Sequence, residues 1–312
     1  TAFFTLRSSD KRVVLLERDR VARGATGRNA GQLTTYFERP LFDIASEFGE
    51  EPAIEAQRGF DEAHDLLDLM ATELETQVRV ERFTGHLGMF SLDHVSVHLR
   101  NGLLRRRGGL RPEACVVSED AEFLGQIPDE FAGLYSVVPQ ARIRELLETS
   151  DDRYRAVLSD RKGCANAGLF AQQALAALER RYPDRLCYRD GTLVDRVVVG
   201  PDGVTVHALG HSVAASHVVL CTNGFTDHVV QDEHGTPIHL HDRQQVVGTI
   251  GYMTAFFEDQ PRTPAAMSYI RNTTIGGDGS SSSNGFGLVM LVLGGLAVAA
   301  ALIRPAGRRA RS

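Results

Sequence analysis

The sequence predicts a mixed α/β (α+β) fold, and three features of the chain point to it. A short aliphatic run at 12–16 has the length of a buried parallel strand and closes on an acidic residue, Glu17. Residues 51–78 carry apolar side chains at helical spacing, with acidic residues on the opposite face. Two further runs, 193–199 and 204–208, are joined by Gly-Pro-Asp-Gly and predict a β-hairpin.

The stretch 12–33 is interpreted as the second half of a nucleotide site. Glu17 stands at the end of the predicted strand, which we expect to be buried on both faces. A carboxylate there can accept the hydroxyl protons of an adenosine ribose. In folds of that type a G-x-G-x-x-G turn lies about 20 residues before the acid, and the sequence shows none before Glu17. We therefore expect a fragment, with 1–7 as the end of a helix.

The charge balance argues against nucleic acid as a partner. The formal net charge is −6, from 34 basic and 40 acidic residues, so the chain as a whole has no positive field. The run Arg105, Arg106 and Arg107 is a local exception. We interpret it as a solvated turn in preference to a phosphate site.

Neither the cysteines nor the histidines form a recognisable metal or disulfide pattern. The cysteines lie far apart, without a C-x-x-C pair, which favours buried free thiols at Cys115, Cys164, Cys187 and Cys221. One polar cluster has a spacing that matches no standard ligand set, so a solvated loop is preferred for His234, His239, His241 and Asp242. No metal site is predicted. The sequence also lacks a G-x-S-x-G elbow, an H-E-x-x-H helix and a Walker loop.

Further along, the chain returns to helix and then to strand. Residues 79–150 show strand-like pieces and turns, and are expected to form a second, mixed domain. A helix is predicted over 168–182, and 212–221 is predicted as a strand that runs into Thr222, Asn223 and Gly224. A small-polar-glycine turn at a strand end lets backbone N–H groups approach a ligand. A tight turn that binds no ligand can have the same sequence.

The last part of the chain has a different composition. Residues 276–285 are a Gly/Ser linker, and 286–303 form an unbroken apolar run of 18 residues. As a helix this run would be about 27 Å long, close to the roughly 30 Å hydrocarbon core of a bilayer, so it is predicted to span a membrane. The basic tail 304–312 favours the cytoplasmic side. A buried helix, or a tail unrelated to the preceding fold, is the alternative, and without an anchor we expect a cytoplasmic protein.

Three segments together resemble one family: LLERDRVARGATGRNAGQL (15–33), the hairpin at 193–208, and VVLCTNG (218–224). They are similar to the FAD-dependent oxidoreductases of the D-amino-acid oxidase and glycine oxidase family. The segment G-A-T-G-R-N-A-G-Q looks most like the amine-oxidising branch that includes gamma-glutamylputrescine oxidoreductase. The resemblance covers about 1–275. It implies an FAD-binding Rossmann-like domain without its first strand (1–45 and 160–230), interleaved with a mixed-sheet substrate domain (46–159 and 231–275).

The resemblance also implies cofactor roles, residue by residue. Glu17 would hold the adenosine ribose, with Arg18 beside the adenine. A loop would pass over the pyrophosphate and the flavin ring, formed by Gly24, Ala25, Thr26, Gly27, Arg28, Asn29, Ala30, Gly31, Gln32 and Leu33. Val194 would bind adenine through its backbone. A strand end near the dinucleotide would consist of Thr222, Asn223 and Gly224. The side chains of Thr26, Arg28 and Asn29 suit contacts to phosphate or flavin.

The activity that the resemblance implies is oxidation of an amine or amino acid by hydride transfer to flavin N5. Oxygen or another acceptor would then reoxidise the flavin. This chemistry needs no obligatory acid or base that a motif would reveal, so no catalytic residue is predicted. Arg243 can meet a substrate carboxylate, although a surface salt bridge is preferred. Two other interpretations stay open: a membrane-tethered remnant that does not bind FAD, and a metal-binding domain on the histidine loop.

Overall fold

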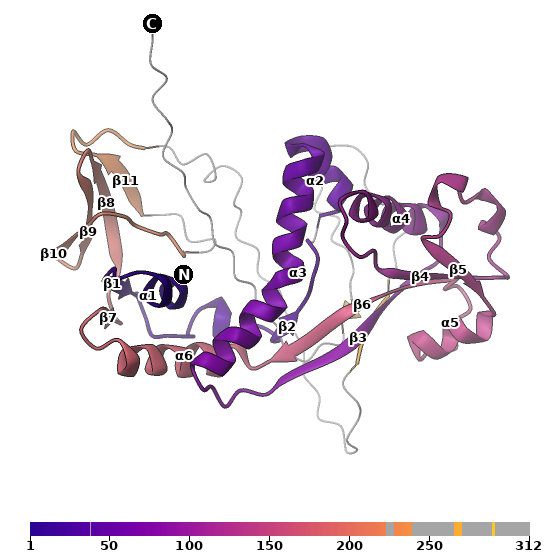
Figure 1. The fold of residues 1–312 in the computed structure, drawn as a ribbon, viewed down its shortest axis with the longest axis horizontal. Coiled ribbons are helices and arrows are strands. Elements are labelled where there is room, and N and C mark those ends of the chain that lie inside the picture. The colour runs from indigo at the N-terminus through magenta and orange to yellow at the C-terminus, as the bar shows by residue number, and fades with distance from the viewer. Residues whose placement is uncertain (38, 223–227, 239–264, 270–288, 291–312) are drawn as a thin grey trace, which may run out of the picture.

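The computed structural model describes residues 1–37, 39–222, 228–238, 265–269 and 289–290. Helices and strands follow one another along this part of the chain, which confirms the predicted mixed α/β class. The strands form three sheets of seven, four and two strands, and helices pack against them (Figure 1).

The seven-stranded sheet is built around one long antiparallel pair. β3 (Val80–Met89) and β6 (Ala156–Ala165) pair along their full length of ten residues each. The strand order is β13-β12-β3-β6-β4-β5, and β2 pairs with β6 beside that path. The other strands are β2 (Gln32–Leu33), β4 (Ala114–Ser118), β5 (Tyr135–Val138), β12 (Ala266–Tyr269) and β13 (Val289–Met290).

Two helices bury opposite faces of the β4 end of this sheet (Figure 1). α4 (Leu92–Arg107) packs Leu99 against Val117 on one face, and α5 (Gln140–Leu147) packs Ile143 against Val157 on the other. Residues 79–150 therefore contain two helices besides the strands and turns that the sequence predicted. α4 was missed because charged and polar residues interrupt its apolar face.

The long helix α3 (Glu50–Glu73) confirms the helix predicted over 51–78, and it follows α2 (Leu41–Phe48) after Gly49. Its most buried face differs from the expected one. Gln57 and His64 are only 2% and 4% exposed, whereas Ala63 of the expected apolar stripe is exposed. This helix therefore buries polar groups against the sheet.

The two-stranded sheet consists of β1 (Val13–Leu16) and β7 (Leu186–Arg189), which are parallel. α1 (Ala2–Ser8) and α6 (Ala167–Arg181) pack against it, and α6 confirms the helix predicted over 168–182. The expectation that the first strand is buried on both faces is wrong, since Val14 is 46% exposed. Within the described residues β1 has one strand neighbour, so part of its surface stays open.

The four-stranded sheet has the order β10-β9-β8-β11. β8 (Val194–Gly200) and β9 (Gly203–Ala208) form the predicted hairpin, and β11 (Val229–Asp232) runs parallel to β8. β10 (His211–Ala215) ends six residues before the predicted end at 221, so that prediction is wrong in its second half. Residues 218–221 are irregular because no described strand pairs with them.

The arginine run is the last turn of α4, and the prediction of a solvated turn is wrong for Arg105. This side chain is 6% exposed and its Nη2 donates to both carboxylate oxygens of Asp61, at 3.0 and 3.1 Å. Its Nε donates to the carbonyl of Arg111 at 2.8 Å. Burial of Glu113 nearby raises the pKa of its carboxyl group, while Arg105 opposes that effect.

All four cysteines are free thiols, as predicted, but their burial differs. Cys115 is buried, and burial raises the pKa of its thiol to about 12. Cys164 and Cys187 are half-buried, and Cys221 is exposed. The prediction of buried thiols is therefore correct for Cys115 and wrong for Cys221.

In the described ranges no helix has both the length and the apolar character needed to cross a membrane. The Gly/Ser linker 276–285 and most of the predicted transmembrane helix 286–303 lie outside those ranges. Val289 and Met290 are the described residues of that segment, and they form a strand, β13, that pairs with β12. A helix over 286–303 is not supported at these two positions.

Candidate functional site

Glu17 directly follows β1, and the backbone fixes its position. Its N–H donates to the carbonyl of Arg189 at 2.9 Å, and its carbonyl accepts from the N–H of Thr192 at 2.8 Å. The carboxylate oxygen Oε1 accepts from the N–H of Asp19 at 2.9 Å. The half-buried carboxylate thus stands at the carboxyl end of a parallel strand, where ribose hydroxyls are bound in dinucleotide folds. Arg18 is exposed beside it.

The glycine-rich loop folds on itself through Asn29. The Nδ2 group donates to the carbonyls of Ala25 and Thr26, both at 2.9 Å, and Oδ1 accepts from the N–H of Gly31 at 2.7 Å. These bonds hold a short 3₁₀ turn at Ala25–Gly27. Residues 24–29 are all exposed, so the loop presents an ordered backbone on the protein surface.

Gly27 attaches this loop to the start of α6. A Cβ built at this position would lie 1.8 Å from the carbonyl oxygen of Ala22, so no other residue fits without a shift of the backbone. Gly168, in the first turn of α6, packs against Gly27, because its Cβ would lie 3.3 Å from the Cα of Gly27. The side chain of Asn166 caps the helix by accepting from the N–H of Leu169 at 2.9 Å.

The end of the loop joins the seven-stranded sheet. Gly31 has a φ of +68°, and its carbonyl accepts from the N–H of Ala165 at 2.9 Å. Gln32 and Leu33 then form β2, opposite Cys164 and Gly163 of β6. The loop is therefore tied at one end to α6 and at the other to the centre of the sheet.

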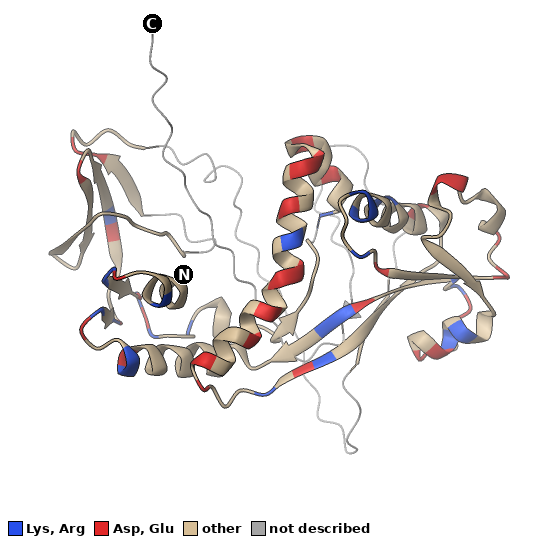
Figure 2. Ribbon diagram, viewed as in Figure 1, with Lys and Arg blue, Asp and Glu red and all other residues tan. Residues whose placement is uncertain are grey.

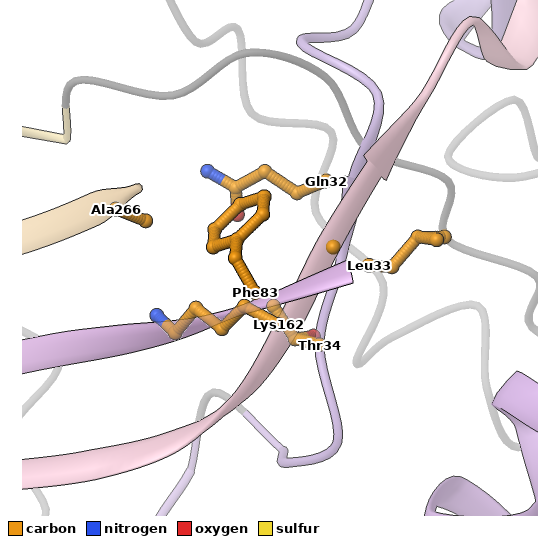
Figure 3. Close-up of a pocket in the computed structure, with 7 residues that line it drawn as sticks. Gln32, Leu33, Thr34, Phe83, Lys162 and Ala266 are labelled. Atoms are coloured by element: carbon orange, nitrogen blue, oxygen red, sulfur yellow. The ribbon is translucent and has the colours of Figure 1, made fainter. Parts of the chain in front are cut away.

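A small cavity of about 10 Å³, room for about one water molecule, lies where β2 meets β3, β6 and β12 (Figure 3). Its lining is Gln32, Leu33, Thr34, Phe83, Lys162, Gly163 and Ala266. Figure 3 shows Gln32 and Lys162 extending toward the Ala266 side, with the ring of Phe83 between them. Gln32 and Leu33 are the residues of the predicted loop that reach this cavity.

A polar interface between α3 and the sheet was not foreseen from the sequence. Gln57 donates to the carbonyl of Thr35 at 2.6 Å and to Asp61 at 3.1 Å, and Arg82 of β3 donates to Asp68 at 2.7 Å. Figure 2 shows acidic positions along α3 and basic positions on β3 and β6. The signal was present in the sequence as a polar stripe with helical spacing at 57, 61, 64 and 68.

His64 lies in that interface, and its pKa is lowered. Burial is the largest cause, followed by the positive charges of Arg82 and Arg161. A buried, neutral imidazole is therefore part of the packing between α3 and the sheet.

The other predicted site residues lie apart from the cavity or outside the described ranges. Val194 begins β8, two residues after Thr192, whose N–H bonds to Glu17, so the structure brings Val194 and Glu17 into one neighbourhood. Thr222 is exposed. The remaining candidates lie outside the described residues: Asn223, Gly224, His239, His241, Asp242 and Arg243. In the described part of the chain no group of three His, Cys, Asp or Glu side chains is arranged to hold a metal ion.

Comparison with known proteins decides the family. Residues 1–295 match the family model of the FAD dependent oxidoreductases, DAO. The chain belongs to this family. The predicted family is therefore confirmed, and FAD is the cofactor of this family. No match was found among the curated proteins.

Similar solved structures are remote in sequence, and their TM-scores are low. Glycine oxidase from Geobacillus kaustophilus has 13% identity and a TM-score of 0.43, covering 71% of this chain and 60% of its own. Glycine oxidase from Bacillus cereus ATCC 14579 has 14% identity and a TM-score of 0.43, covering 72% and 51%. L-proline dehydrogenase from P. horikoshii has 11% identity and a TM-score of 0.42, covering 69% and 53%. This chain thus spans between half and three-fifths of their lengths.

The residues present fit part of the cofactor. Glu17 has the position of a ribose-binding acid, and a Cβ added at the exposed Gly24 would meet nothing within 4 Å, which leaves room for close approach. No G-x-G-x-x-G turn precedes Glu17 in this sequence, so the backbone that usually holds the pyrophosphate is not among these residues. The position of Glu17 thus suits the adenosine end of FAD.

Proposed function

We propose that this chain acts as an FAD-dependent oxidoreductase that oxidises an amine or an amino acid. The loop 24–33 carries the proposal, because it presents an exposed backbone at one end and lines the cavity at the other. A flavin lying over the loop would face the place where β2 joins the seven-stranded sheet. When bound, the flavin supplies the hydride acceptor, its N5 atom. The chain's own residues would orient the substrate and exclude water.

The proposed cofactor contacts keep the roles that the family resemblance implies. Glu17 would bind the ribose hydroxyls, Arg18 would lie beside the adenine, and Val194 would contact the adenine through its backbone. The loop residues from Gly24 to Leu33 would cover the pyrophosphate and flavin, and residues 222–224 would approach the dinucleotide. The position of Val194 close to Glu17 supports the adenosine end of this assignment.

The domain division and the branch of the family are also proposals. Residues 1–45 and 160–230 would bind FAD, and 46–159 and 231–275 would bind the substrate, with β6 passing from one part to the other. The segment at 24–32 supports the amine-oxidising branch. Oxygen or another acceptor would reoxidise the flavin.

Flavin absorbance of the purified chain tests the proposal. We expect the full chain to become yellow with FAD, to lose that colour on denaturation, and to bleach when an amine or amino-acid substrate is added anaerobically. Glu17→Gln should weaken FAD binding by roughly ten-fold through loss of charged hydrogen bonds, whereas Asp10→Asn at an exposed site should not. A chain that stays colourless with FAD in excess would contradict the proposal.

A second candidate function is a chain that binds no FAD and catalyses nothing. It is favoured by β1, which has one strand neighbour within the described residues and leaves Val14 exposed. Membrane tethering through 286–303 belongs to this candidate. Deleting 286–303 and measuring partition into detergent would test it, and equal partition of both chains would exclude an anchor.

A further inference from the structure

The four-stranded sheet has two edges, and they differ in how they are covered. At the β11 edge the chain folds back: the N–H of Ile238 donates to the carbonyl of Val230 at 2.8 Å, and the N–H of Asp232 donates to the carbonyl of Thr236 at 2.9 Å. At the other edge β10 has β9 as its one strand neighbour within the described residues, and Figure 1 shows it on the outside of the molecule. The β10 edge is therefore open to a further strand.

The hairpin turn between β9 and β10 fixes which backbone groups of β10 point outward. A two-residue turn, with φ of +50° at 209 and +79° at 210, joins the strands, so Ala208 and His211 form a hydrogen-bonded pair. Hydrogen-bonded and non-hydrogen-bonded pairs alternate along an antiparallel ladder. The N–H and C=O groups of Ser212 and Ala214 therefore point away from β9, toward the open edge.

The side chains at this edge do not hinder pairing with another strand. Residues 209–217 contain no Asp, Glu, Lys, Arg or Pro, the residue types that commonly protect an edge strand from association. Ser212, Ala214 and Ala215 are small and exposed. A second strand can therefore approach the backbone of β10 closely.

The sequence of this edge reads nearly the same in both directions. Residues 211–217 are His-Ser-Val-Ala-Ala-Ser-His, with Ala214 at the centre. Antiparallel pairing of two copies about a two-fold axis at Ala214 places His211 opposite His217 and Ser212 opposite Ser216. An interface between identical copies about a two-fold axis requires such self-complementarity.

Exposed apolar side chains flank this segment at equal distances. Leu209 and Val219 each lie five positions from Ala214, and they are 62% and 46% exposed. The same two-fold axis brings Leu209 of one copy toward Val219 of the other. Contact between these two side chains would remove apolar surface from water and so favour association.

We infer that two copies of this chain associate through β10, antiparallel and centred on Ala214, so that two four-stranded sheets become one continuous sheet. The outward backbone groups at 212, 214 and 216 would form about six hydrogen bonds in this register. β10 ends at Ala215, so the strand extends by two residues on association. One short strand per copy makes a small interface, and the dimer is therefore weak and concentration-dependent. The inference does not depend on bound FAD.

Sedimentation of the full chain measures this dimer and its dissociation constant. Ala214→Lys places two ammonium groups opposite each other at the axis and should raise the dissociation constant at least roughly ten-fold. Ala63→Lys is the matched control, at an exposed alanine on α3, and should leave the dissociation constant unchanged. A chain that stays monomeric up to roughly millimolar concentration would overturn the inference. A dimer that responds equally to both substitutions would also overturn it.

A charge swap tests the register at Ala214. Ala214→Asp should also weaken self-association, whereas an equal mixture of Ala214→Lys and Ala214→Asp should dimerise, because opposite charges then face each other. A mixture that does not regain association would overturn pairing at this position.

Hydrogen exchange tests the same pairing without any substitution. The amide N–H groups of Ser212 and Ala214 should exchange more slowly at high than at low protein concentration, because they become bonded to the second copy. Exchange rates that are equal at both concentrations would overturn the inference.

Discussion

The seven-stranded and two-stranded sheets contain similar aliphatic strands but bury them differently. In the larger sheet Val117 of β4 has 0% exposure, because strands flank it and α4 covers its face. In the smaller sheet Val14 of β1 is 46% exposed, and β7 is its one described strand neighbour. An aliphatic run therefore specifies a strand in both places, while burial depends on which neighbours pair with it.

The largest effect on the free energy of unfolding is expected in the core of the seven-stranded sheet. Phe131 is 2% exposed in the cluster that joins α4 to the seven-stranded sheet. Phe131→Ala should lower the free energy of unfolding by about 3–5 kcal/mol, because it leaves a cavity in a close-packed core. Val14→Ala should cost less than about 1 kcal/mol. Urea denaturation of both variants checks the contrast, and equal losses would contradict the difference in burial between Phe131 and Val14.

A smaller effect is expected where the loop meets α6. Gly27→Ala brings a Cβ within 1.8 Å of the Ala22 carbonyl oxygen, so the loop must move. We expect a loss of more than about 1 kcal/mol in unfolding free energy and weaker FAD binding. Gly24→Ala is the matched control, since its Cβ meets nothing within 4 Å. Thermal unfolding and flavin titration measure both variants, and similar behaviour of the two would remove Gly27 as the anchor of the loop.

The smallest expected effect concerns pH and the interface of α3. The pKa of His64 is lowered from its ordinary value of 6.5 in the folded chain. Its contribution to stability is therefore present above pH 6.5 and is lost as the pH falls toward the folded pKa. Between pH 7.5 and 5.5 His64→Gln should lose less stability than the parent, by at most about 1.4 kcal/mol. Denaturation curves at both pH values check this, and identical pH dependence would contradict a buried neutral imidazole.

Residue patterns within short segments predicted much of the secondary structure. The spacing of Phe170, Ala174, Ala177 and Leu178 predicted the buried face of α6, and all four are buried. The Gly-Pro-Asp-Gly turn predicted the β8–β9 hairpin. These elements depend on residues close in sequence, so their signals are local.

Features that depend on distant partners were not predictable. Arg105 is buried because Asp61 of α3 pairs with it, 44 positions away in the chain. Lys162 forms part of a cavity because β2, β3 and β12 converge on β6. The sequence of the glycine-rich loop predicted a cofactor-binding loop. Its attachment to α6 through Gly27 and Gly168 became visible only in the tertiary structure.

The contact between Gly85 and Lys162 links two positions that lie 77 apart in the sequence. Any side chain at 85 would overlap the lysine stem, and a shorter residue at 162 would leave a gap beside the glycine. The two positions should therefore change together during evolution. Family members that keep both residues would form a recognisable group, and their shared substrates would be the natural ones to compare with those of this chain.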